Sequence, residues 1–526
     1  MTKSKFLWTI AVFGALLTSV YAQENDKPYL GKLHGGIDAR AGFYQKDDMQ
    51  PLADTVGVNT YLNLNYEYKK FNFGLQYEIF EPPMRGYVPE LKGHRLTQYF
   101  AAYTSDKLGV TLGSFYEQFG SSLIFRSYEE RALGVNTSLR GLNVRYSPVN
   151  WINLKVLAGQ PRKYLDYADA VCAGADADFK LSHLWQKEEG TYNFSVGGAW
   201  LLRHNSKEKP LAVEHENVNL FSVRTAFNTA NINVGLEYTL KGASQSYSPV
   251  MDYVNQSGDA LLVNMDYTTR GFGVSGVFRR VEHMEFRIDN NPTPIYVPLN
   301  YIPALTKQHK YALPALYPHT ANAEGEIGGQ LDAFWDIAYG WLGKYPLKMT
   351  FNASYYRSLG DNLMRTMPFF GKEGTDLFKE ISVEFEKKIS ASVKSTVGFY
   401  AQNKYEDFNH NASYIELIDV LWKINKRNSI RTEIQHMNTQ MKDKAWIYGL
   451  MEVGFARNWT VFGSDMYNYG AAKSEHFYNA GASFTYKSLK AMASYGKNRG
   501  GLQCVGGICR FVPAYTGATV SLSYVF

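Results

Sequence analysis

Residues 517–526 read GATVSLSYVF, and this final stretch of the chain decides the fold class. Its apolar side chains alternate with Gly, Thr and Ser, and they stand at Ala518, Val520, Leu522, Tyr524 and Phe526. Successive side chains of a β-strand point to opposite faces of the sheet. The alternation therefore predicts a strand with one apolar face and one polar face.

The same alternation recurs along most of the chain and breaks every ten to fifteen residues. It is clear over residues 61–69, 71–79, 192–202, 232–240, 272–278, 347–355 and 389–399. In a soluble sandwich the apolar faces would pack on a second sheet. In a membrane barrel they face lipid, and the polar faces line the lumen.

The connections between the expected strands are of two kinds that alternate along the chain. The short polar ones lie near residues 69–70, 105–106, 148–150, 228–230, 269–270, 387–388, 425–427, 457–458 and 487–488. The long ones span residues 81–93, 118–137, 160–175, 203–217, 241–258, 283–323, 357–376 and 498–514. Short periplasmic turns and long extracellular loops are typical of outer-membrane barrels. We expect about 24 strands, within a range of 22 to 26, with both termini in the periplasm.

The terminal residues Leu522, Tyr524 and Phe526 resemble the C-terminal sorting strand that the outer-membrane assembly machinery recognises. A closing strand must carry a lipid-facing side and present an unpaired edge until it meets the first strand. The alternative is an ordinary edge strand that ends the chain by chance. The expected surroundings are outer-membrane lipid and lipopolysaccharide.

The N-terminus has the features of a secretory signal peptide over residues 1–22. Lys3 and Lys5 precede an apolar run from residue 6 to 17, and small or tolerated residues fill positions 20–22. The alternative is a membrane anchor helix, but the run is shorter than the roughly 20 residues that a span needs. Residues 23–526 are then expected to form a single transmembrane β-barrel domain.

The composition agrees with a membrane barrel and disfavours a nucleic-acid-binding protein. Aromatic residues make up 15% of the chain, with 39 Tyr and 31 Phe, and tyrosine suits the bilayer interface because its ring is apolar and its tip polar. The net charge of +6 includes two signal-peptide lysines, so the mature chain carries about +4. No run of Lys or Arg indicates a nucleic-acid partner.

The most unusual segment runs from residue 115 to 141 and reads FYEQFGSSLIFRSYEERALGVNTSLRG. It concentrates charge at Glu117, Arg126, Glu129, Glu130, Arg131 and Arg140. One interpretation is a loop folded into the barrel, where opposed charges form a pore constriction and set selectivity. The other is a structured extracellular loop held by exposed ion pairs of little energetic weight.

This segment, together with the end of the chain, resembles a known family. The pattern FYEQFG…R.YEERALG…LRG and the ending GLQCVGGICRFVPAYTGATVSLSYVF are similar to those of a large, porin-like outer-membrane β-barrel family that is common in Bacteroidetes and has no assigned activity. The resemblance covers the whole mature chain. It implies the barrel and the membrane but no substrate.

The cysteines suggest one disulfide and no metal centre. Cys504 and Cys509 flank two glycines that permit a tight reversal, so a small disulfide-closed loop is sterically feasible. A metal site is the alternative, but no His or further Cys stands nearby with ligand spacing. The third cysteine, Cys172, has no expected disulfide partner, and we expect it to be either a small buried residue or a thiol in a loop.

The connection from residue 283 to 323 is the longest expected loop. It carries six prolines and four tyrosines over residues 292–318. A loop of this length is usually functional or disordered, and its aromatic content argues against disorder. We expect it to fold over or into the lumen; the alternative is an extracellular cap without function.

The sequence contains no nucleophile elbow, phosphate-binding loop, dinucleotide fingerprint or zinc-protease motif, so we expect neither an enzyme nor a cofactor. The first hypothesis is a porin-like channel for passive or facilitated passage of small solutes. The second is a non-transporting scaffold, or a partner in a secretion or envelope complex. The third is an outer-membrane hydrolase whose site is assembled from distant strands.

Overall fold

The computed structural model describes residues 30–46, 54–185, 191–205, 217–248, 252–288, 298–338, 340, 343–360 and 368–526. The signal peptide expected over residues 1–22 lies outside these ranges. Within them, no helix has the length and hydrophobicity needed to span a membrane.

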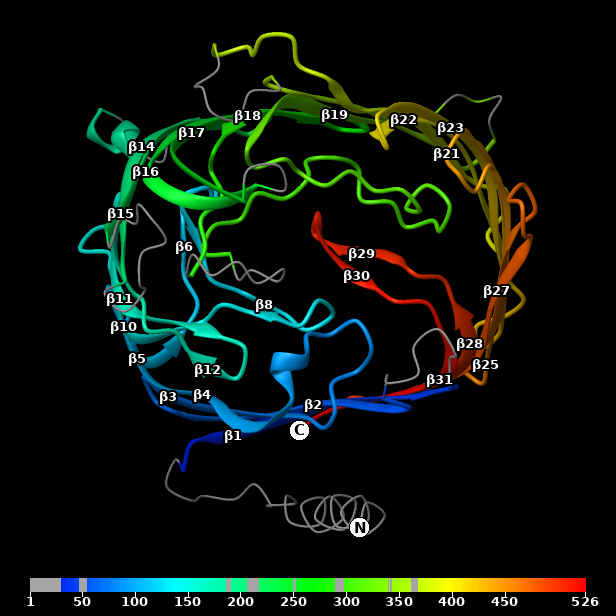
Figure 1. The fold of residues 1–526 in the computed structure, drawn as a ribbon, viewed down its shortest axis with the longest axis horizontal. Helices are drawn as coiled ribbons and strands as arrows, with labels where there is room; N and C mark the ends of the chain where they lie inside the picture. Colours follow the sequence, from blue (N-terminus) through cyan, green and yellow to red (C-terminus); the bar gives the residue numbers. More distant parts are fainter. Residues whose placement is uncertain are drawn as a thin grey trace.

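The described residues form one large antiparallel sheet that closes into a barrel (Figure 1). The first half of the wall is built from β1 (Lys32–Tyr44), β2 (Val56–Tyr68), β3 (Phe71–Phe80), β4 (Gly93–Thr104), β5 (Leu108–Phe115), β10 (Leu139–Tyr146), β11 (Ile152–Lys163), β13 (Val171–Phe179), β14 (Tyr192–His204), β15 (Asn217–Thr229), β16 (Ile232–Ser248) and β17 (Asp252–Thr269). The second half is built from β18 (Phe272–Glu282), β19 (Gly325–Ile337), β20 (Leu347–Ser358), β21 (Asp376–Lys388), β22 (Val393–Glu406), β23 (Asn409–Lys423), β24 (Ser429–Thr439), β25 (Ala445–Phe455), β26 (Trp459–Asn468), β27 (Glu475–Tyr486), β28 (Leu489–Asn498) and β31 (Tyr515–Val525).

The main sheet has 25 strands, of which β12 (Asp166–Tyr167) pairs only with the end of β11. The other 24 strands form the closed wall, as the sequence predicted. The chain closes where β31 pairs with β1, and the backbone groups of Phe526 and Gly35 exchange hydrogen bonds of 2.9 and 3.0 Å. A Cβ at Gly35 would lie 2.2 Å from Phe526 Cζ, so the terminal ring needs glycine at this position. The predicted closing strand is confirmed.

The two ends of the barrel differ in their connections. At one end most strands are joined by tight turns; Tyr68 pairs with Phe71, for example, and leaves two residues between them. Two connections at this end are longer, residues 180–191 and 338–346. β1 begins and β31 ends at this same end. The opposite end carries the long connections. Two of the long loops were predicted wrongly, because β11, β13, β16 and β17 extend into the ranges 160–175 and 241–258.

The outer face of the wall is apolar, because the alternating side chains that point away from the lumen are large hydrophobic residues. Val223 is 65% exposed and Ile381 is 60% exposed. Exposed aromatic residues gather beside the tight turns, at Tyr66, Phe71, Tyr146, Tyr192, Tyr267, Trp335, Trp422, Trp459 and Tyr486. An apolar band bordered by aromatic side chains is the surface that a lipid bilayer requires.

Candidate functional site

Five connections from the long-loop end turn inward and lie inside the ring of wall strands (Figure 1). They are residues 81–92, 116–138, 164–170, the described part of 283–324, and 499–514. Segment 81–92 contains the short helix η1 (Pro89–Leu91), and segment 164–170 contains β12. Segment 116–138 contains β6 (Gln118–Phe119), β7 (Phe125–Arg126), β8 (Glu129–Glu130) and β9 (Val135–Asn136), and segment 499–514 contains β29 (Gly501–Val505) and β30 (Ile508–Val512). We call them the in-folded segments. They make the lumen the candidate functional site.

Segment 116–138 reaches the middle of the wall. The backbone N–H of Ser121 donates to a carboxylate oxygen of Glu237 in β16 at 2.7 Å, and the Ser121 hydroxyl donates to the same oxygen. Glu117 accepts from Arg145 Nε at 2.7 Å and lies 3.3 Å from Lys155 Nζ. Burial alone would raise the pKa of Glu117, but the hydrogen bond from Arg145 and the charge of Lys155 hold that pKa below its usual value. The carboxylate therefore ties the segment to β10 and β11.

The structure brings two of the six candidate constriction residues together. Arg131 Nε donates to Glu129 at 3.0 Å, and its guanidinium lies over the ring of Tyr61 at 4.4 Å. A second carboxylate, that of Asp38 in β1, lies 3.8 Å from Arg131. Glu130 accepts the backbone N–H of Ala132 at 3.0 Å, so it stabilises a local turn.

The other three candidates lie elsewhere in the lumen. Arg126 lies over the ring of Tyr301 at 4.0 Å, which joins segment 116–138 to the long segment 283–324. Arg140 lies over Tyr167 at 4.1 Å and donates to Gln160 at 2.9 Å. Glu117 is held separately by Arg145. The six residues thus form several separate contacts within the lumen.

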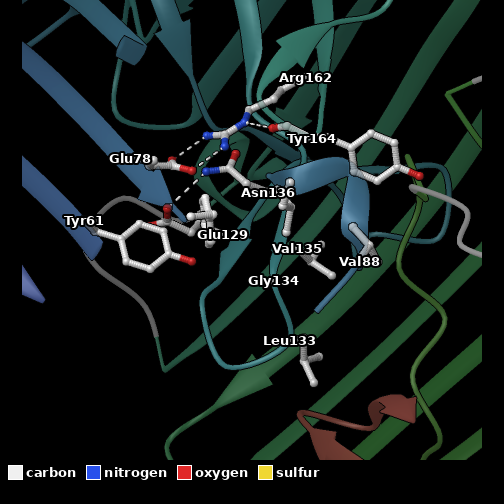
Figure 2. Close-up of a pocket in the computed structure, with 12 residues that line it drawn as sticks. Tyr61, Glu78, Val88, Glu129, Leu133, Gly134, Val135, Asn136, Arg162 and Tyr164 are labelled. Carbon is white, nitrogen blue, oxygen red and sulfur yellow. Dashed lines mark hydrogen bonds and ion pairs between the residues drawn. The ribbon is translucent and has the colours of Figure 1, made fainter. Parts of the chain in front are cut away.

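A small cavity of about 50 Å³ lies between the wall and segments 81–92 and 116–138 (Figure 2). On its polar side Arg162 makes a bidentate pair with Glu78, with N–O distances of 2.7 and 2.6 Å, and each side chain is 2% exposed. Arg162 Nε also donates to the carbonyl of Tyr164 at 2.6 Å (Figure 2). Sequence reasoning missed this pair, because its members lie 84 residues apart and neither belongs to a motif.

The described part of segment 283–324 follows the inner wall from β18 towards β25 (Figure 1). Its polar groups bind inward-facing side chains of successive strands. The contacts are Lys307–Glu384 at 2.6 Å, His309–Glu380 at 3.0 Å, Tyr311–Asp419 at 3.2 Å and the Leu313 backbone N–H to Gln435 at 2.9 Å. The expectation that this connection enters the lumen is confirmed for residues 298–324; residues 289–297 lie outside the described ranges.

The β29–β30 hairpin projects from β28 and β31 into the lumen (Figure 1). Cys504 and Cys509 pair in its register and form the predicted disulfide. Its tip is Gly506–Gly507, and both residues have positive φ, 59° and 83°. Tyr301 donates to the Gly506 carbonyl at 2.5 Å, so the hairpin meets segment 283–324.

Part of the lumen is apolar. Phe119 and Ile124 of segment 116–138 pack in one buried cluster with Leu201 and Leu220, which point inward from β14 and β15. Cys172 of β13 is fully buried in the same cluster. The expectation of a polar inner face is therefore wrong here. Segment 116–138 covers these inward-facing apolar side chains, which would be exposed in an empty barrel.

No group of three or more His, Cys, Asp or Glu side chains is placed to hold a metal ion in the part of the chain that the structure describes. The contacts that do occur there, ion pairs, hydrogen bonds and apolar packing, position loops within a lumen.

Solved structures with a similar fold are β-barrels of the outer membrane. One is the translocation pore of the P pilus usher PapC, where the match covers 94% of this chain and 99% of that chain, with 11% identity and a TM-score of 0.45. Another is a chain of an E. coli P pilus tip assembly intermediate, PapC-PapD-PapK-PapG. That match covers 96% of this chain and 62% of that chain, with 11% identity and a TM-score of 0.51. The siderophore receptor PirA from Pseudomonas aeruginosa is matched over 95% of this chain and 81% of its own, with 11% identity and a TM-score of 0.42. Only the match with a TM-score above 0.5 supports a shared fold, and identities this low indicate nothing about a substrate.

No curated protein sequence matches this chain. A family model described as a family of unknown function, DUF6029, matches residues 2–526. This agrees with the expectation of an outer-membrane-type barrel family that has no assigned activity. Because the match spans nearly the whole chain, the protein belongs to the DUF6029 family of unknown function.

Proposed function

We propose that the protein is a porin-like outer-membrane channel for passive or facilitated passage of small solutes, narrowed by its own in-folded segments. One observation carries this proposal: the segments inside the ring are anchored to the inner wall, as Ser121 is to Glu237 and Lys307 to Glu384. Barrels of 16–18 strands already leave an aqueous channel, so a 24-strand barrel needs internal narrowing to be selective. Anchored loops supply that narrowing.

The proposed topology places the tight-turn end, with both chain termini, in the periplasm and the long connections at the cell surface. The difference between the two ends supports this orientation, because outer-membrane barrels have short periplasmic turns. The apolar outer face would contact lipid and lipopolysaccharide. The Bacteroidetes association suggested by the sequence motifs remains a prediction.

We propose that segment 116–138 contributes to the constriction through Glu117, Arg126, Glu129, Glu130, Arg131 and Arg140. Their position on or beside a segment inside the ring supports this role. Charged groups that face a narrow lumen discriminate among solutes by charge as well as by size.

Planar bilayers with the purified protein test the channel. Wild-type protein should give discrete conductance steps. The Glu237→Ala variant should give larger steps, because it removes the carboxylate that holds Ser121 against β16. Phe408→Ala is the matched control, since Phe408 is 92% exposed at a hairpin tip and should leave the step size unchanged.

The variants also separate this channel from a contaminating porin, whose steps would be the same in all three preparations. A wild-type protein that inserts but does not conduct would contradict the proposed function.

The second candidate is a non-transporting scaffold or partner in an envelope complex. The observation that favours it is the apolar cluster around Phe119 and Leu220, because it fills part of the lumen like the core of a soluble domain. It predicts a stoichiometric protein partner that co-purifies under gentle extraction. A conducting barrel that purifies alone would count against it.

A further inference from the structure

Two arginines from separate in-folded segments lie in one aromatic region of the lumen. Arg85 belongs to segment 81–92 and stacks over the Tyr44 ring at 4.6 Å. Arg510 belongs to β30 and stacks over the Tyr87 ring at 3.9 Å. The two segments touch, since a Cβ on Gly86 would lie 3.1 Å from a methyl group of Val512.

Neither guanidinium is satisfied by the described part of the protein. All three guanidinium nitrogens of Arg85 are buried without a hydrogen-bond partner, and so are Nε and Nη1 of Arg510. The remaining nitrogen of Arg510 donates to Gln503 at a long 3.3 Å. Buried N–H donors without acceptors are costly, because they have lost their hydrogen bonds to water.

Three arginines of the wall have different partners. Arg162 is paired with Glu78, Arg279 with Glu326 at 2.9 Å, and Arg280 with Asp259 and Glu282 at 2.5 Å each. Each of these guanidinium groups has a carboxylate of the chain. No described carboxylate lies within 4.0 Å of Arg85 or Arg510, which therefore leave positive charge in the lumen.

After burial, the largest influences on the pKa of Arg510 come from tyrosine phenols. Burial lowers the pKa of Arg510, and Tyr87, Tyr61, Tyr44 and Tyr515 are the groups that partly oppose this effect. An arginine stays protonated in proteins, so the site keeps its positive charge. Ring stacking covers one face of a guanidinium, whereas its N–H groups lie in its plane and are not used by the ring.

We propose that Arg85 and Arg510 form a subsite for small oxyanions, carboxylate or phosphate, inside the lumen. The planar fork of each guanidinium matches the paired oxygens of such anions. This inference rests on the proposed channel function and gives it a substrate class: the pore favours anions. The subsite is distinct from the charged residues of segment 116–138, on which sequence reasoning had concentrated.

The first experiment measures ion selectivity of the full chain in planar bilayers across a KCl gradient. The wild-type reversal potential should show chloride preference, and the permeability ratio of chloride to potassium should fall roughly threefold or more in Arg85→Gln/Arg510→Gln. The matched control is Arg427→Gln/Arg457→Gln, which removes two exposed arginines from the tight-turn end. It should keep the wild-type ratio. A conducting double variant with the wild-type ratio overturns the subsite but leaves the channel standing.

The second experiment needs no conductance. Inorganic phosphate, at ionic strength matched with KCl, should raise the melting temperature of the detergent-solubilised wild type by about 2 °C and leave Arg85→Gln/Arg510→Gln unchanged. If the wild type shows this shift but does not conduct in bilayers, the subsite is supported and the proposed channel function is contradicted. No shift in the wild type, or an equal shift in the variant, overturns the subsite.

Discussion

Two arginines of the barrel wall, Arg162 and Arg279, and two arginines of the in-folded segments, Arg85 and Arg510, are held in opposite ways. Arg162 and Arg279 of the wall are almost fully buried, and each is neutralised by a carboxylate of another wall strand, Glu78 of β3 and Glu326 of β19. Arg85 and Arg510 of the segments lie on tyrosine rings and have no described acid. Arg162 and Arg279 therefore stabilise the fold, whereas Arg85 and Arg510 are the arginines that we propose to bind an anion.

The largest effect on stability is expected when the ion pair between Glu78 and Arg162 in the wall is broken. Glu78→Gln should lower the free energy of unfolding by about 3–5 kcal/mol, because it leaves Arg162 buried without its carboxylate. Urea unfolding of the barrel in lipid vesicles measures the change. Arg85→Gln is the matched comparison, and it should cost less than about 1 kcal/mol, since it breaks no ion pair.

Glu78→Gln/Arg162→Met should recover part of the lost free energy of unfolding, because it also removes the unpaired charge of Arg162. Equal free-energy costs for Glu78→Gln and Arg85→Gln would contradict the proposed difference between Arg162 and Arg85.

A smaller effect is expected from the hairpin that carries Arg510. Cys504→Ser/Cys509→Ser should destabilise the hairpin by about 2 kcal/mol, because the open chain gains conformational freedom. Hydrogen exchange over residues 501–512 should accelerate, while exchange in the wall strands stays unchanged.

A reducing agent should produce the same change in the wild type and none in the double serine variant. Slow exchange in the reduced wild type would show that the contacts of Tyr301 with the tip are sufficient to order the hairpin.

The wall was predictable from sequence because lipid on one side and a lumen on the other impose strict alternation. The closing strand that ends at Phe526, the tight turns and the strand number all follow from this local rule. The disulfide was equally local, since Cys504 and Cys509 flank a two-glycine turn. In each case the interacting residues are close in sequence or share one periodic pattern.

The interior was less predictable because its contacts join residues that only barrel closure brings together. Ser121 and Glu237 are 116 residues apart, and nothing in either neighbourhood marks the pair. The apolar inner face around Leu201 and Leu220 was missed because alternation does not show which inward side chains an in-folded segment covers. Arg85 lies outside both family patterns and Arg510 lies in the C-terminal one without an assigned role, so only the missing acids in the structure single them out.

Liposome swelling with neutral sugars of increasing size tests most directly whether the in-folded segments leave a narrow path through the barrel. The wild-type protein should admit monosaccharides rapidly and exclude large dextrans, while Glu237→Ala should raise the size limit by loosening Ser121. A wild-type protein that admits no sugar, or one that admits dextrans as fast as monosaccharides, would contradict a lumen narrowed by its own segments.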